Sequence, residues 1–244
     1  MPADAAPSFL LLAELPGVGG RVTLPEDESH YLTRVCRARA GERATATDGR
    51  GGLATLRLVE TGRRAVVEIE TCDRARAPRS AWVLAGAPEG NRGDWMVEKL
   101  AELGVTTFAP IDCERGRWER VGGRAERWQR LAVAALRQSR RRFLLEVLPP
   151  RPIAEAVAGH TEAGCWLADA EGAPASTLQP PSAGQAVGLV GPASGLTPGE
   201  RELASRAGFR PISLADGRLR TETAAIAWAG WWAGAPAGGP VFAS

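Results

Sequence analysis

The sequence contains almost no lysine. Lys99 is the only one among 30 basic residues, so nearly all of the positive charge is arginine. A GC-rich genome explains this bias simply, but arginine also binds phosphates and bases better, because its planar guanidinium forms bidentate hydrogen bonds and stacks. The net charge is only +2, which by itself indicates no class of partner.

Cysteine and histidine are also scarce. The four cysteines lie far apart and form no CxxC pair, the spacing typical of zinc and redox sites. We therefore expect reduced thiols that pack in the interior, with neither a disulfide nor a metal site. His30, one of two histidines, is interpreted as a packing or capping residue.

Long apolar runs are absent. No segment reaches the roughly 18 uncharged apolar residues that a membrane span requires. The apolar residues 9–12 are not preceded by a basic segment, so no secretory signal is expected and a cytoplasmic location is predicted. The 244 residues can form one large domain or two modest ones.

Residues 21–72 have the pattern of a small β domain. A short helix is expected at 25–37, and three segments with partial alternation follow it, separated by the turn signals DGRGG and ETGRR. These strands are expected at 42–48, 53–60 and 65–71. The pattern predicts a small β-barrel domain over residues 1–75, with a linker at 73–80.

From residue 81 onward, short apolar strands alternate with amphipathic helices. This order predicts an α/β domain over residues 80–244, with a parallel sheet and helices on both faces. Gly104 stands where a helix C-terminal glycine belongs, and Thr197 with Glu200 has the spacing of a capping box. The expected strands are 82–88, 106–112, 164–169, 186–192 and 211–216. The expected helices are 92–105, 123–142, 153–158, 197–208 and 221–234.

Three of these strands end in segments that could hold a ligand: WLADAEG, GLVGPASGLTPGE and ISLADGRLRTETA. Ligands of open α/β sheets bind beyond the carboxyl ends of the strands, and small residues let the backbone approach a ligand closely. Neither a GxGxxG fingerprint nor a P-loop is present, which disfavours nucleotide triphosphate chemistry. The alternative is that these segments are ordinary strand-to-helix turns.

Five segments in order resemble one family: HYLTRVCRARAGE, EKLAELGV, RWQRLAVAALRQSRR, VGPASGLTPGE and LADGRLRTETAA. Together they resemble the RsmE family of ribosomal RNA methyltransferases in the SPOUT superfamily, over roughly residues 20–230. The resemblance implies a PUA-like β-barrel followed by a trefoil-knotted α/β domain, and a homodimer. It also implies that S-adenosylmethionine binds in the knot, that no metal is needed, and that N3 of a uridine in small-subunit ribosomal RNA is methylated.

The resemblance also implies a set of cofactor-binding residues on the three strand ends. They are Leu167, Val190, Gly191, Pro192, Gly195, Leu196, Leu214, Ala215, Leu219, Arg220, Thr221, Thr223 and Ala224.

The match departs from the family pattern in both loops of the expected knot. Ala193 and Ser194 replace a glutamate and a glycine, and Ala215 replaces a glycine. Gly217 stands where the family carries an arginine. Two rival functions follow: a non-catalytic RNA-binding or ribosome-assembly protein, and a SPOUT enzyme that methylates a ribose 2′-hydroxyl or another base.

Arg220 and Glu222 are the candidate catalytic residues. Attack of uridine N3 on a sulfonium methyl leaves negative charge on the base, which a fixed guanidinium stabilises. Glu222 could orient Arg220 or accept the proton. The alternative is a surface Arg220 paired with Glu222 beside a helix cap.

Exposed arginines are the candidate contacts to RNA phosphates, in both predicted domains. A solvated helix face is the alternative interpretation of such runs. The three tryptophans of the expected last helix could stack on bases, but packing in the core or a dimer interface is favoured. The candidate RNA-binding residues are Arg34, Arg37, Arg92, Arg115, Arg130, Arg137, Arg140 and Arg141.

Overall fold

A computed structural model describes residues 8–118, 124–160, 164–181 and 184–235. The chain divides into two compact units. The first comprises Met1–Pro78 together with Leu136–Leu144, and the second comprises Arg79–Ala135 and Leu145–Ser244. The domain bounds predicted from the sequence leave out the return of 136–144 to the first unit, because nothing in the local pattern marks it.

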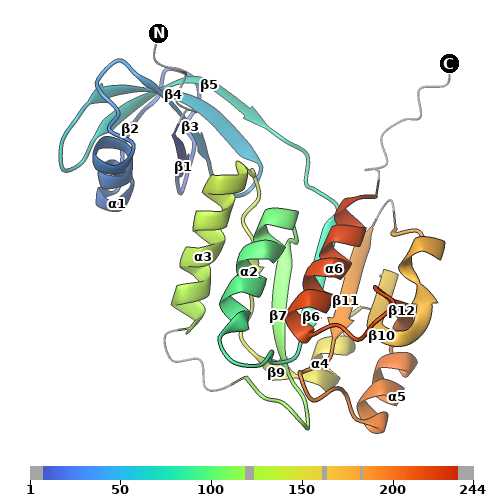
Figure 1. The fold of residues 1–244 in the computed structure, drawn as a ribbon. Coiled ribbons are helices and arrows are strands. Elements are labelled where there is room, and N and C mark those ends of the chain that lie inside the picture. Colours follow the sequence, from blue (N-terminus) through green and yellow to red (C-terminus); the bar gives the residue numbers. More distant parts are fainter. Residues whose placement is uncertain (1–7, 119–123, 161–163, 182–183, 236–244) are drawn as a thin grey trace, which may run out of the picture. The chain divides into compact units, whose positions relative to one another are not determined.

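The first unit is built on one five-stranded sheet in the order β1-β3-β4-β5-β2 (Figure 1). The three strands expected from the alternation are present. Two further strands were not predicted, since three residues are too few to show a period. The strands are β1 (Phe9–Leu11), β2 (Arg21–Thr23), β3 (Arg43–Thr47), β4 (Gly52–Glu60) and β5 (Val66–Arg74).

The expected helix over 25–37 is found as α1 (Glu26–His30) followed by a π-helical segment (Tyr31–Val35). Its Leu32 is fully buried with Leu56 of β4 and Val67 of β5 in the core of this unit. The expected linker at 73–80 is shorter than predicted, because the residues at 73 and 74 continue β5 in register with the start of β4.

The second unit has a parallel sheet in the order β12-β10-β11-β6-β7-β8, with the short β9 paired to β7 (Figure 1). The α/β architecture predicted from the sequence is therefore confirmed. Its strands are β6 (Ser80–Ala85), β7 (Thr107–Asp112), β8 (Glu146–Val147), β9 (Arg151–Pro152), β10 (Gly164–Pro174), β11 (Gln185–Val190) and β12 (Arg210–Ser213). Its helices are α2 (Arg92–Leu103), α3 (Arg124–Ser139, shared with the first unit), α4 (Ile153–Val157), a 3-10 turn (Ala175–Thr177), α5 (Pro198–Arg206) and α6 (Thr221–Ala233).

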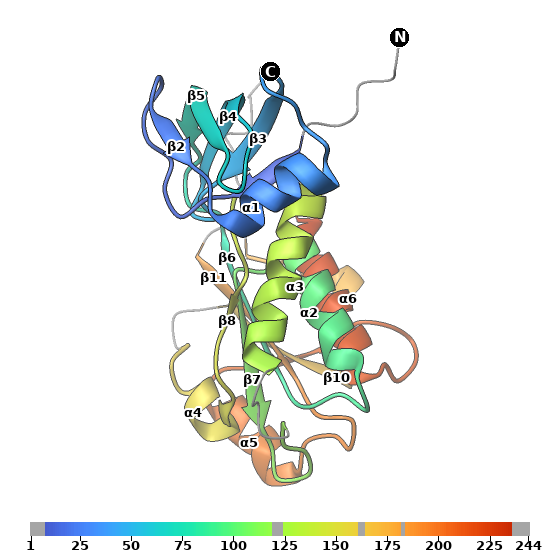
Figure 2. The same cartoon turned by 90° about the vertical axis from the view of Figure 1, so that its left-hand side faces the viewer.

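Helices cover both faces of this sheet, with α2 and α6 on one side and α4 and α5 on the other (Figure 2). Successive residues of β11 face opposite sides of the sheet and so contribute to a separate apolar core on each side. Val187 and Leu189 point into the cluster that α4 and α5 complete, whereas Gly188 faces Trp228 of α6. A strand buried on both faces reads as one apolar run, as this strand does.

The predicted helix ends are confirmed. Gly104 ends α2 with a φ of 82°, in the left-handed region that glycine tolerates. Thr197 and Glu200 form the capping box of α5. The strand expected at 164–169 is longer, since β10 continues to Pro174 beyond a register shift between Ala168 and Ala173.

The tryptophans of α6 are packed inside the second unit. Trp228 and Trp232 are buried, and Trp231 packs edge-on against Trp166 while its indole N–H donates to the carbonyl of Ala175. This helix is apolar on all sides because it lies between the sheet and α2. The packing interpretation therefore accounts for these side chains, and base stacking does not.

The four cysteines are free thiols. Burial raises the pKa of Cys113 to about 12 and that of Cys165 to about 11, so neither forms a reactive thiolate near neutral pH. Among the described residues, no helix has both the length and the apolarity to cross a membrane. The same part of the chain brings together no group of three or more metal-binding side chains.

Gly188 is expected to tolerate no side chain. A Cβ there would lie 2.4 Å from Cδ2 of Trp228, so the Gly188→Ala variant overpacks the core between β11 and α6. We expect a loss of about 1–3 kcal/mol in the free energy of unfolding, measured in urea. Gly199→Ala on α5 is the matched control, because no atom lies within 4 Å of its added Cβ. Equal stability of the two variants would contradict this packing.

Candidate functional site

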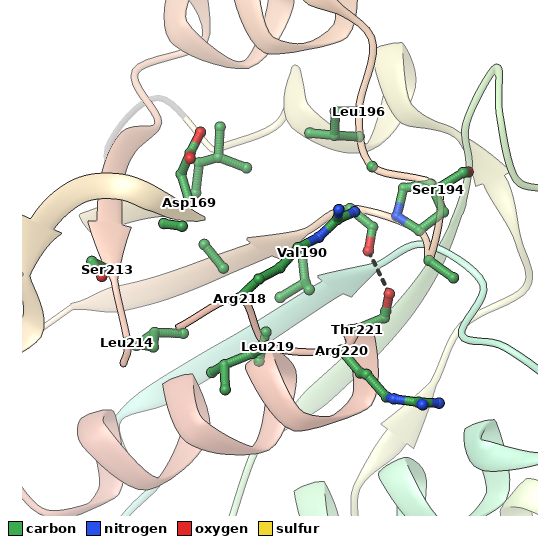
Figure 3. A pocket seen from close by; sticks show the side chains of 18 of the residues that line it. Asp169, Val190, Ser194, Leu196, Ser213, Leu214, Arg218, Leu219, Arg220 and Thr221 are labelled. Atoms are coloured by element: carbon green, nitrogen blue, oxygen red, sulfur yellow. Dashed lines mark hydrogen bonds between the residues drawn. The ribbon is translucent and has the colours of Figure 1, made fainter. Parts of the chain in front are cut away.

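A cavity of about 840 Å³ opens at the carboxyl ends of β11 and β12 and at the register shift in the middle of β10 (Figure 3). It lies between two loops: residues 191–197 after β11 (the first loop) and residues 214–220 after β12 (the second loop). Its size is that of a typical small-ligand pocket, about 300–1,000 Å³. The three segments singled out in the sequence therefore meet at one site, although the first of them, WLADAEG, lies within β10 and not at its end.

The cavity collects almost the whole set of predicted cofactor-binding residues. Thr223 is the exception, because it is exposed on the first turn of α6 and does not line the cavity. The predicted residues that line it are Leu167, Val190, Gly191, Pro192, Gly195, Leu196, Leu214, Ala215, Leu219, Arg220, Thr221 and Ala224.

The first loop is held by close backbone packing. Pro192 lies against Gly86 and Gly116, where an added Cβ would come within 2.5 and 2.6 Å of proline atoms. The Ser194 hydroxyl donates a 2.6 Å hydrogen bond to the carbonyl of Arg115. The serine that departs from the family pattern thus ties this loop to the segment after β7.

The second loop leads directly into α6, whose N-cap residue is Arg220. This arginine makes no side-chain cap, so it leaves the amide groups of the first turn uncapped. The next residue, Thr221, is buried and donates its hydroxyl to the carbonyl of Gly191 at 2.9 Å (Figure 3). One hydrogen bond therefore joins the start of α6, directly after the second loop, to the first residue of the first loop.

The charged side chains of the site are mostly paired. Glu222 is buried and its Oε1 accepts from Arg92 at 3.0 Å. The guanidinium of Arg220 lies 3.3 Å from Glu89, and both side chains are largely exposed. The hypothesis that Glu222 orients Arg220 is therefore replaced by a different pairing, in which each residue has its own partner.

Some cavity residues were not assigned from the sequence. The register shift in β10 places Asp169 and Glu171 on the rim, and Asp169 pairs with Arg201 of α5. Arg218 of the second loop also lines the cavity. The sequence predicts a strand end at WLADAEG, but composition does not reveal the bulge. Arg218 lies inside the LADGRLRTETAA motif, which by itself predicts no role for it.

The arginines predicted to bind RNA fall into both units. Arg115 lines the cavity, and Arg92 belongs to the ion pair described above. The remaining candidates on the surface are Arg34, Arg37, Arg130 and Arg140, all exposed, and Arg141, which is half-buried. Their contact with RNA stays a prediction.

Arg137 has a different environment from the other arginines predicted to bind RNA. Its guanidinium forms an ion pair with the buried Glu28 and lies 4.6 Å from the centre of the Tyr31 ring, all within the first unit. Burial raises the pKa of Glu28, and Arg137 opposes that rise. These contacts give Arg137 a packing role in the first unit.

The ion pair between Arg92 and Glu222 is expected to support the cavity wall. Arg92→Ala should lower the free energy of unfolding by about 1–3 kcal/mol, because it leaves a buried carboxylate unpaired. The double variant Arg92→Ala/Glu222→Gln should recover part of this loss, since the charge is removed with its partner. Urea unfolding measures both.

The matched control is Arg206→Ala, which breaks an exposed pair with Glu202 within α5 and should cost well under 1 kcal/mol. A loss for Arg92→Ala no larger than that of the control would show that the pair does not support the site.

Two family models match this chain, one for each part. Residues 24–70 match an RNA methyltransferase PUA domain, and residues 75–233 match an RNA methyltransferase domain. The first unit is thus a PUA-like domain, and the cavity belongs to the methyltransferase domain.

Curated relatives and solved structures agree with these matches. Ribosomal RNA small subunit methyltransferase E of Synechocystis sp. is 30% identical over 222 residues, covering 88% of this chain and 73% of the relative. The protein of the same name from Mycobacterium bovis is 30% identical over 233 residues, covering 86% and 85%. The crystal structure of this enzyme from Neisseria gonorrhoeae, bound to S-adenosyl methionine, is 31% identical with a TM-score of 0.84, and the match covers 92% of this chain and 95% of that one. The chain is a member of the ribosomal RNA small subunit methyltransferase E family.

Proposed function

We propose that this protein transfers a methyl group from S-adenosylmethionine to N3 of a uridine in small-subunit ribosomal RNA. The observation that carries the proposal is the cavity between the first and second loops, which gathers all but one of the predicted cofactor-binding residues. The family membership and the S-adenosyl methionine bound to the Neisseria gonorrhoeae relative support it.

The cavity fits a nucleoside-sized cofactor. Its walls combine apolar side chains such as Leu167, Val190 and Leu196 with small residues that expose backbone groups, as at Gly191 and Ala215. Such lining holds a flat base by packing and by main-chain hydrogen bonds. When bound, the cofactor supplies an electrophilic methyl group on its sulfonium.

Arg220 is proposed to act on the target base. Its side chain is exposed at the cavity, and its ion-pair partner Glu89 is itself exposed, so the guanidinium can move to a ligand without a large loss. Placed at a uridine carbonyl oxygen, it would stabilise the negative charge that develops as N3 loses its proton. Glu222 is committed to Arg92, and we assign it to positioning that arginine.

The finer features of the family remain part of this proposal. We infer that the first and second loops belong to a trefoil knot, which the hydrogen bond between Thr221 and Gly191 would fasten. We also infer a homodimer and contacts from the exposed arginines of both units to RNA phosphates, whose strength would fall with salt.

The function is tested by incubating the protein with labelled S-adenosylmethionine and small ribosomal subunits or their RNA. Transfer of label to one uridine N3, located by primer extension, is the expected result. Binding of RNA and cofactor without transfer would favour the assembly-factor alternative, and label on a ribose would favour a different SPOUT reaction.

Arg220→Ala should lower methyl transfer by roughly 10²–10³-fold, the loss typical of removing one transition-state donor. The melting temperature should stay nearly unchanged, because the ion pair that is lost is exposed. Cofactor affinity, measured by calorimetry, should fall much less than turnover. Full activity of this variant, or a loss of stability with activity per folded molecule preserved, would refute the assigned role.

A further inference from the structure

Arg218 lines the cavity but has no part in the function proposed above. Its side chain runs from the second loop across the cavity toward the first loop (Figure 3). Its Nη2 atom lies 4.0 Å from the position that a Cβ on Gly195 would occupy. Gly195 has a φ of 78° and no side chain, so the guanidinium faces an open part of the first loop.

Among the residues that the structure describes, Arg218 has no ion-pair partner. Of the other arginines that line the cavity, Arg201 pairs with Asp169 and Arg220 with Glu89. Within the described part of the chain, Arg218 and Arg115 form no ion pair. A guanidinium held over a cavity without an acidic partner is suited to an anionic group of the ligand.

The cofactor carries one such group. S-adenosylmethionine has a single anionic centre, the carboxylate of its amino-acid part, and a planar guanidinium binds a carboxylate through two parallel hydrogen bonds. The side chain of Arg218 extends across the cavity (Figure 3), whereas Arg115 belongs to the segment after β7 that borders it. A cofactor carboxylate inside the cavity therefore fits Arg218 better than an RNA phosphate outside it.

We propose that Arg218 binds the amino-acid carboxylate of the cofactor and so sets the preference of the site for ligands that carry this group. The proposal rests on the proposed function, because it names a contact within the same site. Arg218 acts on binding and contributes nothing to the charge that develops on the target base.

The residue before Arg218, Gly217, is a position to which the arginine side chain can be moved. Gly217 stands where the family pattern has an arginine, one position before Arg218. No atom lies within 4 Å of a Cβ added at Gly217, and its φ is not in the left-handed region. A side chain can therefore be moved back by one position without a clash with the fold.

The experiment compares two ligands by calorimetry. S-adenosylhomocysteine carries the amino-acid carboxylate, and 5′-methylthioadenosine lacks the whole amino-acid part. Arg218→Ala should weaken binding of S-adenosylhomocysteine by roughly 10-fold or more, the range for a hydrogen bond to a charged group, and leave 5′-methylthioadenosine nearly unchanged. Arg206→Ala, which removes an exposed arginine of α5 outside the cavity, is the matched control and should change neither affinity.

A second pair of variants separates charge from packing. Arg218→Val should behave like Arg218→Ala. Gly217→Arg/Arg218→Val should regain part of the preference for S-adenosylhomocysteine, because a guanidinium returns to the same loop. Thermal unfolding checks that all variants are folded.

Several results would overturn the proposal. Equal weakening of both ligands by Arg218→Ala would indicate loss of the cavity shape, and no weakening would leave the carboxylate with another partner. If Arg115→Ala loses the preference for S-adenosylhomocysteine and Arg218→Ala keeps it, the carboxylate binds Arg115. Loss of RNA binding alone would assign Arg218 to a phosphate. If the wild-type protein binds neither ligand, the proposed function itself fails. If it binds both and Arg218→Ala leaves the ratio of the two affinities unchanged, only the role of Arg218 fails.

Discussion

The hydrogen bond between the Thr221 hydroxyl and the Gly191 carbonyl is the contact on which the site depends. It joins the first residue of α6 to the residue that follows β11, and therefore connects the two loops that form the cavity. Thr221 is buried and Gly191 is half-buried, so water has limited access to the bond. The packing of Pro192 against Gly86 and Gly116 fixes the first loop from the other side. A ligand then meets a preformed space, and little of its binding energy is spent on ordering the chain.

Much of this arrangement could be predicted from the sequence. Long apolar strands such as β11 and capped helices such as α5 have local signals, and these were found close to their observed bounds. The shorter β1 and β2 have no period to detect. The bulge of β10 depends on its pairing with β12, where Ala168 and Ala173 both lie opposite Ile212, and such pairing exists only in the folded sheet.

The same limit applies to the charged residues of the site. The sequence places Arg137 among the candidate RNA-binding arginines, but its partner Glu28 is more than a hundred positions away in the chain. Arg92 and Glu222 are also distant in sequence, and no local pattern pairs them. The sequence shows where the arginines are, but only the folded structure shows which of them form ion pairs with carboxylates. In the cavity the fold pairs Arg201 and Arg220 with carboxylates and leaves Arg218 and Arg115 without an ion pair among the described residues.

The segment Leu136–Leu144 has a consequence for how this protein can be divided. It lies within the sequence of the methyltransferase domain but belongs to the compact unit of the PUA-like domain. There the Arg142 guanidinium meets Asp73, and Leu144 packs against the backbone of Gly49. A fragment that ends at Pro78 would lack these partners, and one that begins at Arg79 would carry their apolar surfaces without cover. Recombination that exchanges the N-terminal module as a single contiguous piece would therefore break these contacts.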